Sequence, residues 1–104
     1  MDLKKPEECF SVEEVRNEID KIDKQIMKLY GKRHKYIEEI VRFKNDEDGI
    51  IAHDRKKQVI HDRRKWAEEN GLDADTFEKM YTLLIENNIK SELEILKLKK
   101  DNSV

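Results

Sequence analysis

The sequence predicts an all-α domain of three helices, of which the first is very long. Apolar residues recur at spacings of three and four from Ser11 to Lys44, which is the period of one buried helix face. The chain has one proline and three glycines, so few positions interrupt a helix. Charged residues make up 44% of its 104 residues, against about 25% in a typical domain. The scarce apolar surface must therefore form narrow stripes on amphipathic helices.

The first helix is expected from Ser11 to Lys44. Ser11 and Glu14 form an S-x-x-E capping box at its start. Its inward stripe contains Val15, Ile19, Ile22, Ile26, Leu29, Ile37 and Ile40, and also Arg33 and Lys44. Such a helix would be roughly 50 Å long, whereas a domain of this size has a radius of gyration near 13 Å. Because the stripe extends beyond one globule, we expect a second chain to cover it in a two-fold homodimer.

Two further helices follow. The acidic cluster before Gly49 predicts a turn from Asn45 to His53. Asp54 is the expected N-cap of a helix through about Asn70, with Gly71 as its C′ residue. Asp73 is expected to cap a third helix that continues to about Lys99, before a frayed tail over residues 101–104. No repeat or linker divides the sequence, so residues 1–104 are expected to form a single domain.

Composition argues against several classes of function. The net charge of −2 and the pI near 6.0 do not suit a nucleic-acid binder. The basic run Arg63–Lys65 has acidic neighbours and is interpreted as a solvated helix face. The single cysteine, Cys9, excludes an intrachain disulfide, and no apolar run approaches the roughly 20 residues of a membrane span. Because the first residues also lack the apolar part of a signal peptide, we expect a cytoplasmic protein with no membrane partner.

Polar residues interrupt the inward stripes of all three helices. They are Arg33 and Lys44 on the first helix, Arg55 on the second, and Asn88 and Glu92 on the third. Each alone has a structural explanation: an arginine extends its guanidinium to water, an asparagine sets register, and a glutamate forms a buried salt bridge. Together, however, three cations and one carboxylate leave a surplus of positive charge. A small dianion would complete such a cluster.

The chemistry open to this cluster is narrow. No nucleophile is paired with a base, the three histidines match no metal-ligand spacing, and no glycine-rich phosphate loop is present. No metal or cofactor is therefore expected. What is left is electrostatic catalysis, in which fixed donors hold a substrate carboxylate and stabilise the charge that develops in the transition state.

Four segments carry a family resemblance. They are VRNEIDKIDKQIMKLYGKRHKYIEEIVRFK, the DR after a short turn, WAEENGLDA, and LLIENNIKSELEIL. Together they resemble the all-helical chorismate mutase family, which includes the isochorismate pyruvate lyases. The resemblance implies an intertwined homodimer in which each long helix crosses into the partner's half. It also implies a small dicarboxylate substrate, chorismate, which a Claisen rearrangement converts to prephenate in the shikimate pathway.

The resemblance also implies roles for six residues. The implied substrate-binding residues are Arg16 from the partner chain, Arg33, Lys44, Arg55, Asn88 and Glu92. The three arginines would bind the carboxylates, and Lys44 would bind a carboxylate and the ether oxygen. Asn88 would meet the ring hydroxyl or a carboxylate, and Glu92 takes the place where many relatives have a glutamine that donates to the ether oxygen. An ionised carboxylate only accepts hydrogen bonds, so Glu92 needs a proton for this role. Burial raises its pKa and nearby cations lower it, and the sequence leaves the balance open.

The reaction type is also left open. The lead KKPEEC, the short turn after Lys44 and the segment WAEENGLDA are closer to the lyases. The pair Asn88 and Glu92 and the ending ELEIL are closer to the mutases. We therefore expect a chorismate mutase, with an isochorismate pyruvate lyase as the alternative. An amino-substituted chorismate as substrate and a helical interaction module without activity are further alternatives.

Overall fold

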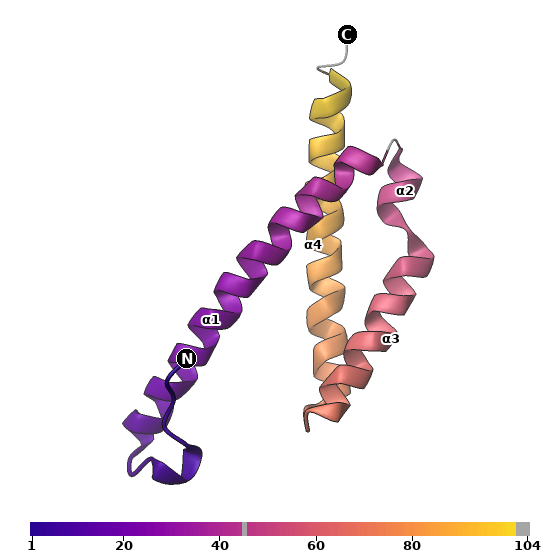
Figure 1. Cartoon of the computed structure of the whole chain (residues 1–104). Coiled ribbons are helices and arrows are strands. Elements are labelled where there is room, and N and C mark those ends of the chain that lie inside the picture. Colours follow the sequence, from indigo (N-terminus) through magenta and orange to yellow (C-terminus); the bar gives the residue numbers. More distant parts are fainter. Residues whose placement is uncertain (45, 102–104) are drawn as a thin grey trace. The chain divides into compact units, whose positions relative to one another are not determined.

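The computed structural model describes residues 1–44 and 46–101, which are helical apart from short connections (Figure 1). The elements are η1 (Pro6–Glu8), α1 (Val12–Glu39), η2 (Ile40–Phe43), α2 (Glu47–Ile51), α3 (His53–Glu69) and α4 (Ala74–Asp101). This confirms the predicted all-α class with a long first helix. Asn45 in the expected turn and residues 102–104 in the expected tail lie outside the described residues.

The chain divides into two compact units, Met1–Lys35 and Tyr36–Val104. The single domain over residues 1–104 stays a prediction. In the first unit, the Oγ of Ser11 accepts a hydrogen bond from the Glu14 N–H at 3.1 Å. The carboxylate of Glu14 accepts one from the Phe10 N–H at 2.5 Å. The predicted capping box is thus present, with its return bond shifted from the N–H of Ser11 to that of Phe10.

The first α-helix ends five residues earlier than the expected Lys44. It ends at Glu39, and the chain tightens into the 3-10 helix η2. Lys44 then adopts an extended conformation, with φ −115° and ψ 134°. The stripe pattern did not show this change, because spacings of three residues persist in a 3-10 turn. Lys44 therefore projects from the segment after the helix and not from its last turn.

The predicted turn from Asn45 to His53 is wrong over most of its length, because it contains α2. Asp46 caps this helix by accepting the N–H of Gly49 on Oδ1 at 2.8 Å. A single residue, Ala52, separates α2 from α3 in a left-handed conformation with φ 40°. The predicted N-cap at Asp54 is also wrong, since α3 begins at His53 and Asp54 lies in its first turn.

The later boundaries agree with the predictions. Gly71 follows α3 with a positive φ of 72°, the conformation expected at C′. Asp73 accepts the N–H of Thr76 at 3.0 Å and its hydroxyl at 2.7 Å, so it caps α4. Hydrogen bonding by Thr76 holds the pKa of this aspartate below its usual range. The helix runs to Asp101, two residues beyond the expected end.

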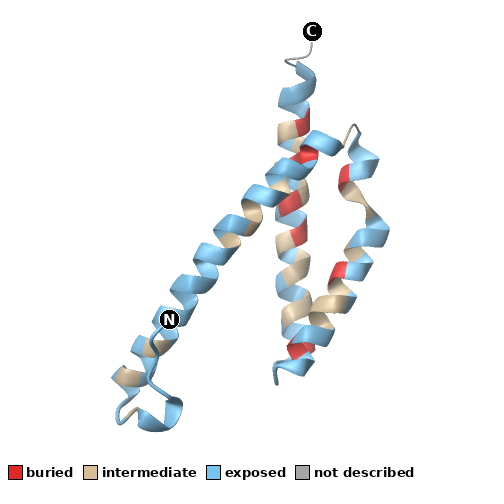
Figure 2. Ribbon diagram, in the orientation of Figure 1, coloured by how far each residue is buried: buried red, intermediate tan, exposed pale blue. Residues whose placement is uncertain are grey.

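The core of the second unit is built around α4, which lies beside α3 (Figure 1). Val41, Ile50 and Leu96 join η2, α2 and α4 in one buried cluster. Figure 2 shows buried positions at intervals on α3 and α4, whereas no residue of α1 is buried. Arg64 of α3 also pairs with Asp75 at 2.9 Å and Glu78 at 3.1 Å on α4. Burial and ion pairing together hold α3 against α4.

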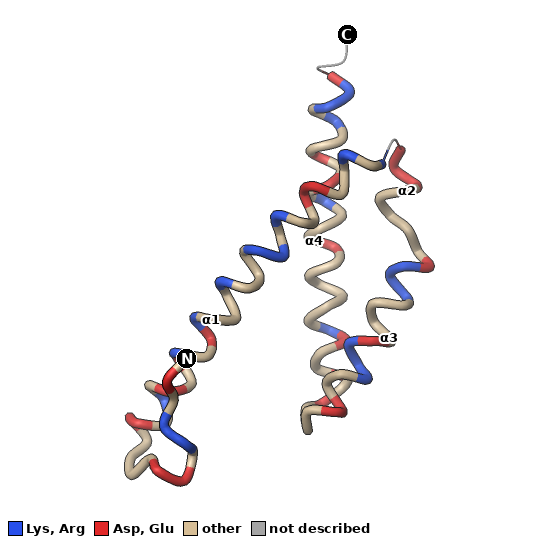
Figure 3. The backbone as a smooth tube through the Cα atoms, in the orientation of Figure 1, with Lys and Arg blue, Asp and Glu red and all other residues tan. Residues whose placement is uncertain are grey.

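Charged residues of both signs occur along all the longer helices (Figure 3). Within residues 1–44 and 46–101, no helix has both the length and the apolarity that a membrane crossing requires.

Candidate active site

The inward face of α4 carries the two polar side chains that the structure buries among its described residues. Asn88 is 5% exposed and Glu92 is 6% exposed. They lie one helical turn apart, in line with the buried Ile85 and Leu96. Apolar packing on both sides of the pair therefore fixes two polar groups in a largely water-free position.

The environment of Glu92 raises its pKa above the ordinary value of 4.5. Removal of the carboxylate from water is the main cause, because a buried charge loses its hydration. The positive charge of Lys44 acts in the opposite direction and is the smaller effect. Within the single chain, burial thus outweighs Lys44, and the neutral carboxyl persists to higher pH than that of an exposed glutamate. In this form Glu92 carries an O–H that can donate a hydrogen bond.

Lys44 reaches this region from the segment between η2 and α2. Its backbone N–H bonds to the carbonyl of Val41 at 3.1 Å, which closes η2. Its Nζ donates a hydrogen bond to the carbonyl oxygen of Gly49 in α2 at 2.5 Å. Because Val41 packs with Leu96 of α4, the segment that carries Lys44 is held beside the helix that carries Glu92. The ammonium group of Lys44 is therefore close enough to the Glu92 carboxyl to act on its pKa, and their joint role in a substrate site stays a prediction.

The three predicted arginines are placed differently. Arg55 lies exposed in the first turn of α3, with Nη1 3.4 Å from Oε1 of Gln58 on the same helix. Arg16 and Arg33 lie on α1 in the first unit, where Arg16 is exposed and Arg33 is half-buried. The convergence of these arginines with Lys44 and Glu92 stays a prediction.

The carbonyl of Gly49 was not predicted as a partner of Lys44. A backbone acceptor has no side-chain signal, but α2, which presents it, could have been recognised. Asp46 followed by Glu47 and Asp48 is a capping residue with an acidic first turn, which marks a helix start as well as a turn.

Arg63 of α3 contacts one aromatic ring on its own helix and one on α4. The guanidinium of Arg63 lies 4.6 Å from the ring of Trp66 and 5.5 Å from that of Tyr81. Arg63 thus joins α3 to α4 through cation–π contacts.

No cluster of three or more metal-ligating side chains occurs in the part of the chain that the structure describes.

Comparison with known proteins decides the family. The model of the family chorismate mutase type II matches residues 15–93. The chain belongs to the chorismate mutase type II family. It is 36% identical over 92 residues to an isochorismate pyruvate lyase of Pseudomonas aeruginosa, covering 88% of this chain and 91% of that protein. It is 33% identical over 76 residues to a chorismate mutase of Methanocaldococcus jannaschii, covering 72% of this chain and 77% of that protein.

Proposed function

We propose that this chorismate mutase-type protein catalyses the Claisen rearrangement of chorismate to prephenate. The observation that carries this proposal is the buried Glu92 carboxyl, with its raised pKa, beside the ammonium of Lys44. In the rearrangement one C–O bond breaks as a C–C bond forms within the same molecule, so the protein supplies no nucleophile. Negative charge develops on the ether oxygen, and donors fixed beside that oxygen stabilise the transition state more than the ground state.

The proposed roles follow from this charge distribution. Lys44 donates to the ether oxygen and to one carboxylate, and neutral Glu92 donates to the same oxygen from α4. Asn88, one turn from Glu92, meets the ring hydroxyl or a carboxylate. Arg33, Arg55 and the partner's Arg16 bind the two carboxylates. The reaction needs no metal or cofactor, and its product would serve aromatic amino acid synthesis through the shikimate pathway.

A homodimer is part of the proposal, because Arg16 acts in the partner's site. The support comes from α1, whose apolar stripe is unburied in the single chain. Its members Val15, Ile19, Ile22, Ile26 and Leu29 are 38–61% exposed. A stripe of this length on a protein with so much charge is expected to be covered by a second apolar surface. A second copy of α1 in two-fold symmetry supplies one.

The test is an ultraviolet assay of chorismate loss by the purified protein without added metal or cofactor. We expect saturable loss of chorismate with prephenate as the product, unchanged by a chelator. The Lys44→Ala variant is the matched control for contaminating activity. Chorismate that persists beside wild-type protein, or that is lost equally with the variant, would refute the mutase proposal.

A second candidate is elimination of pyruvate from isochorismate to give salicylate. It is favoured by the 36% identity to the Pseudomonas lyase over 88% of this chain. Both reactions break a C–O bond beside two carboxylates, so the same basic pocket suits either. Assays of isochorismate, with salicylate fluorescence and pyruvate as readouts, separate them from each other. Amino-substituted chorismate belongs in the same comparison, and turnover of none of the three would favour a helical interaction module.

A further inference from the structure

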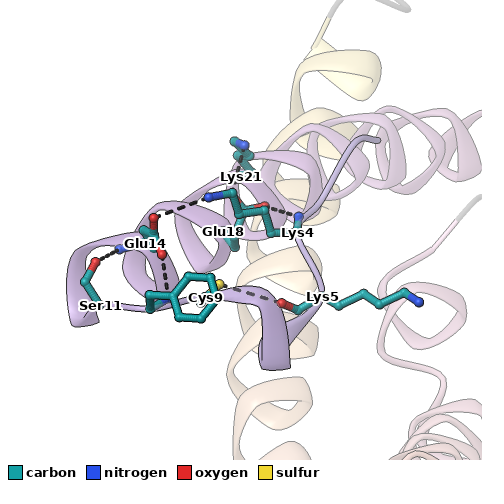
Figure 4. Close-up of polar contacts among 8 residues, drawn as sticks. Lys4, Lys5, Cys9, Ser11, Glu14, Glu18 and Lys21 are labelled. Carbon is teal, nitrogen blue, oxygen red and sulfur yellow. Dashed lines mark hydrogen bonds and ion pairs between the residues drawn. The ribbon is translucent and has the colours of Figure 1, made fainter.

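The residues before α1 fold back along that helix as an arm, Lys4–Phe10 (Figure 4). The backbone N–H of Lys4 donates to Oε2 of Glu18 at 3.0 Å. The Nζ of Lys4 donates to Oε1 of Glu14 at 3.3 Å, and the other oxygen of Glu14 accepts the N–H of Phe10. The arm is therefore attached to α1 at both of its ends, and Glu14 binds both ends.

The two glutamates are suited to this attachment. The side chain of Glu18 is only 13% exposed and also pairs with Lys21 at 3.0 Å. Hydrogen bonding by Lys21 lowers the pKa of Glu18, and the Phe10 N–H lowers that of Glu14. Both side chains are thus carboxylates at neutral pH. Exposed ion pairs alone stabilise weakly, but backbone N–H groups that donate to carboxylates form the stronger, charge-assisted kind of hydrogen bond.

The arm leads from one face of α1 to another. Glu14, Glu18 and Lys21 follow one another at helical spacing on the face that binds Lys4. The end of the arm instead lines an open groove of about 610 Å³ that includes Val15 and Ile19 of the apolar stripe. The groove residues are Cys9, Phe10, Ser11, Val12, Val15, Arg16 and Ile19. Phe10 in this groove is 90% exposed, so an uncovered aromatic ring shares a surface with Arg16.

We propose that the arm is a positioning element of the substrate site. The carboxylates of Glu14 and Glu18 hold it so that Cys9 and Phe10 form a wall of the groove that Arg16 lines. This inference rests on the proposed function, which assigns Arg16 to a substrate carboxylate in the partner's site. Because Phe10 is 90% exposed, its ring is open to contact a substrate bound at Arg16, and an arm that is already fixed loses less conformational freedom when it makes that contact. The contact acts equally on bound substrate and transition state, so it favours binding and not the chemical step.

The Glu18→Ala variant tests this directly. It removes the acceptor of the Lys4 N–H while Glu14 still binds the arm, so we expect KM to rise by up to about 10-fold, the smaller end of what a hydrogen bond to a charged group contributes. We expect kcat to change by less than about 2-fold. Glu18→Gln keeps an oxygen for the Lys4 N–H and should rescue most of the loss. The control is Glu8→Ala, which removes an equal charge from an exposed position in the arm.

The reactivity of Cys9, the one cysteine of the chain, measures how firmly the arm is held. This measurement does not depend on enzyme activity. Cys9 is half-buried, and its Sγ lies 3.7 Å from the carbonyl oxygen of Lys5. If Glu18 holds the arm, Glu18→Ala should speed the reaction of Cys9 with an aromatic disulfide reagent, and Glu8→Ala should not. Circular dichroism checks that each variant is folded. Phe10→Ala keeps the hydrogen bonds of Glu14 and Glu18 to the arm. It should therefore raise KM without raising the rate at which Cys9 reacts with the reagent.

Each combination of results bears on the inference. A raised KM together with faster reaction of Cys9 in Glu18→Ala supports it. The inference is overturned if Glu18→Ala changes only KM, only the reaction rate of Cys9, or neither of them. An unchanged KM in Phe10→Ala also overturns it. If Glu18→Ala does not fold, the Phe10→Ala result decides. Wild-type protein that turns over none of chorismate, isochorismate and amino-substituted chorismate refutes an enzymatic function, and this inference with it. An active wild-type enzyme with unaffected variants refutes this inference alone.

Discussion

At the scale of single residues, burial and charge act in opposite directions on Glu92. Desolvation raises its pKa and Lys44 lowers it, and the net shift is upward. The carboxyl is therefore a proton donor over part of the pH range in which most glutamates are acceptors only. The same shift has a consequence for stability, since the folded chain binds this proton more tightly than the unfolded chain does.

Glu92→Gln should therefore stabilise the protein in a pH-dependent way. Well below pH 4.5 the carboxyl is protonated in both the folded and unfolded states, and the raised pKa has no effect on stability. As pH rises towards the raised pKa, the unfolded chain ionises first and wild-type stability falls. Once pH exceeds the raised pKa, the variant should be the more stable protein, by about 1.4 kcal/mol for each tenfold difference in proton affinity between the folded and unfolded chains. Denaturant unfolding of both proteins at several pH values measures this, and a gain independent of pH would contradict it.

Lys44→Ala and Arg33→Ala should lose far more rate than stability. For Lys44, removal of a donor to the developing oxyanion costs about 100-fold or more in kcat. For Arg33, loss of the charge that holds a substrate carboxylate disturbs the alignment of the reacting atoms and also lowers kcat. The described hydrogen bond of the Lys44 ammonium is the one to Gly49, and such a bond contributes about 1 kcal/mol net. Steady-state kinetics and thermal unfolding of the same preparations compare the two effects. Variants that mainly unfold at lower temperature, with kcat preserved, would favour a purely structural role.

At the scale of elements, helix ends depend on residues that are close in sequence, so the sequence predicts many of them. Ser11, Asp73 and Gly71 were assigned correctly because capping depends on neighbours in sequence. The α2 helix was missed because its five residues include Gly49, and a short acidic run before glycine is also typical of a turn. The extended conformation of Lys44 follows η2, whose Val41 packs with Leu96 of α4, a residue distant in sequence. Local patterns contain no such information.

Two glycine substitutions test the element boundaries. Gly71→Ala should destabilise the protein by roughly 1 kcal/mol, because an L-residue at φ 72° is strained. Gly31→Ala should stabilise it by up to about 1 kcal/mol, because Gly31 lies inside α1, where alanine is the better helix former. An added Cβ meets no atom within 4 Å at either position. Thermal unfolding compares the pair, and shifts of the same sign would contradict the assigned backbone conformations.

At the scale of the whole molecule, the sequence predicts features that need a second chain, and a single chain does not show them. The residue pattern identified the family and placed Asn88 and Glu92 on an inward surface, where the structure buries both. It placed Lys44 on the stripe of the first helix, whereas Lys44 follows η2 in an extended conformation. It gave no indication that the arm folds back on α1, because Lys4, Glu14 and Glu18 are ordinary surface residue types. The position of Arg16 in a complete site depends on a partner chain, which the stripe of α1 predicts.

Light scattering during gel filtration tests the homodimer. We expect a mass of twice the 12.5 kDa of one chain. Ile22→Asp places a charge in the centre of the exposed apolar stripe, where a partner helix would bury it at a large cost. This variant should dissociate and lose activity together. Its surface control is Lys24→Asp, two residues away on another face. A wild-type protein that is monomeric at the concentrations used for activity would contradict the shared site.

The pH dependence of kcat/KM in wild-type protein and in Glu92→Gln tests the central role of the buried carboxyl most directly. In the wild type, kcat/KM for chorismate should fall as pH rises through the raised pKa of Glu92, because the donor to the ether oxygen loses its proton. A glutamine amide donates at every pH, so the variant should keep a level profile over the same range. Matching profiles in the two proteins would contradict a catalytic role for the Glu92 proton.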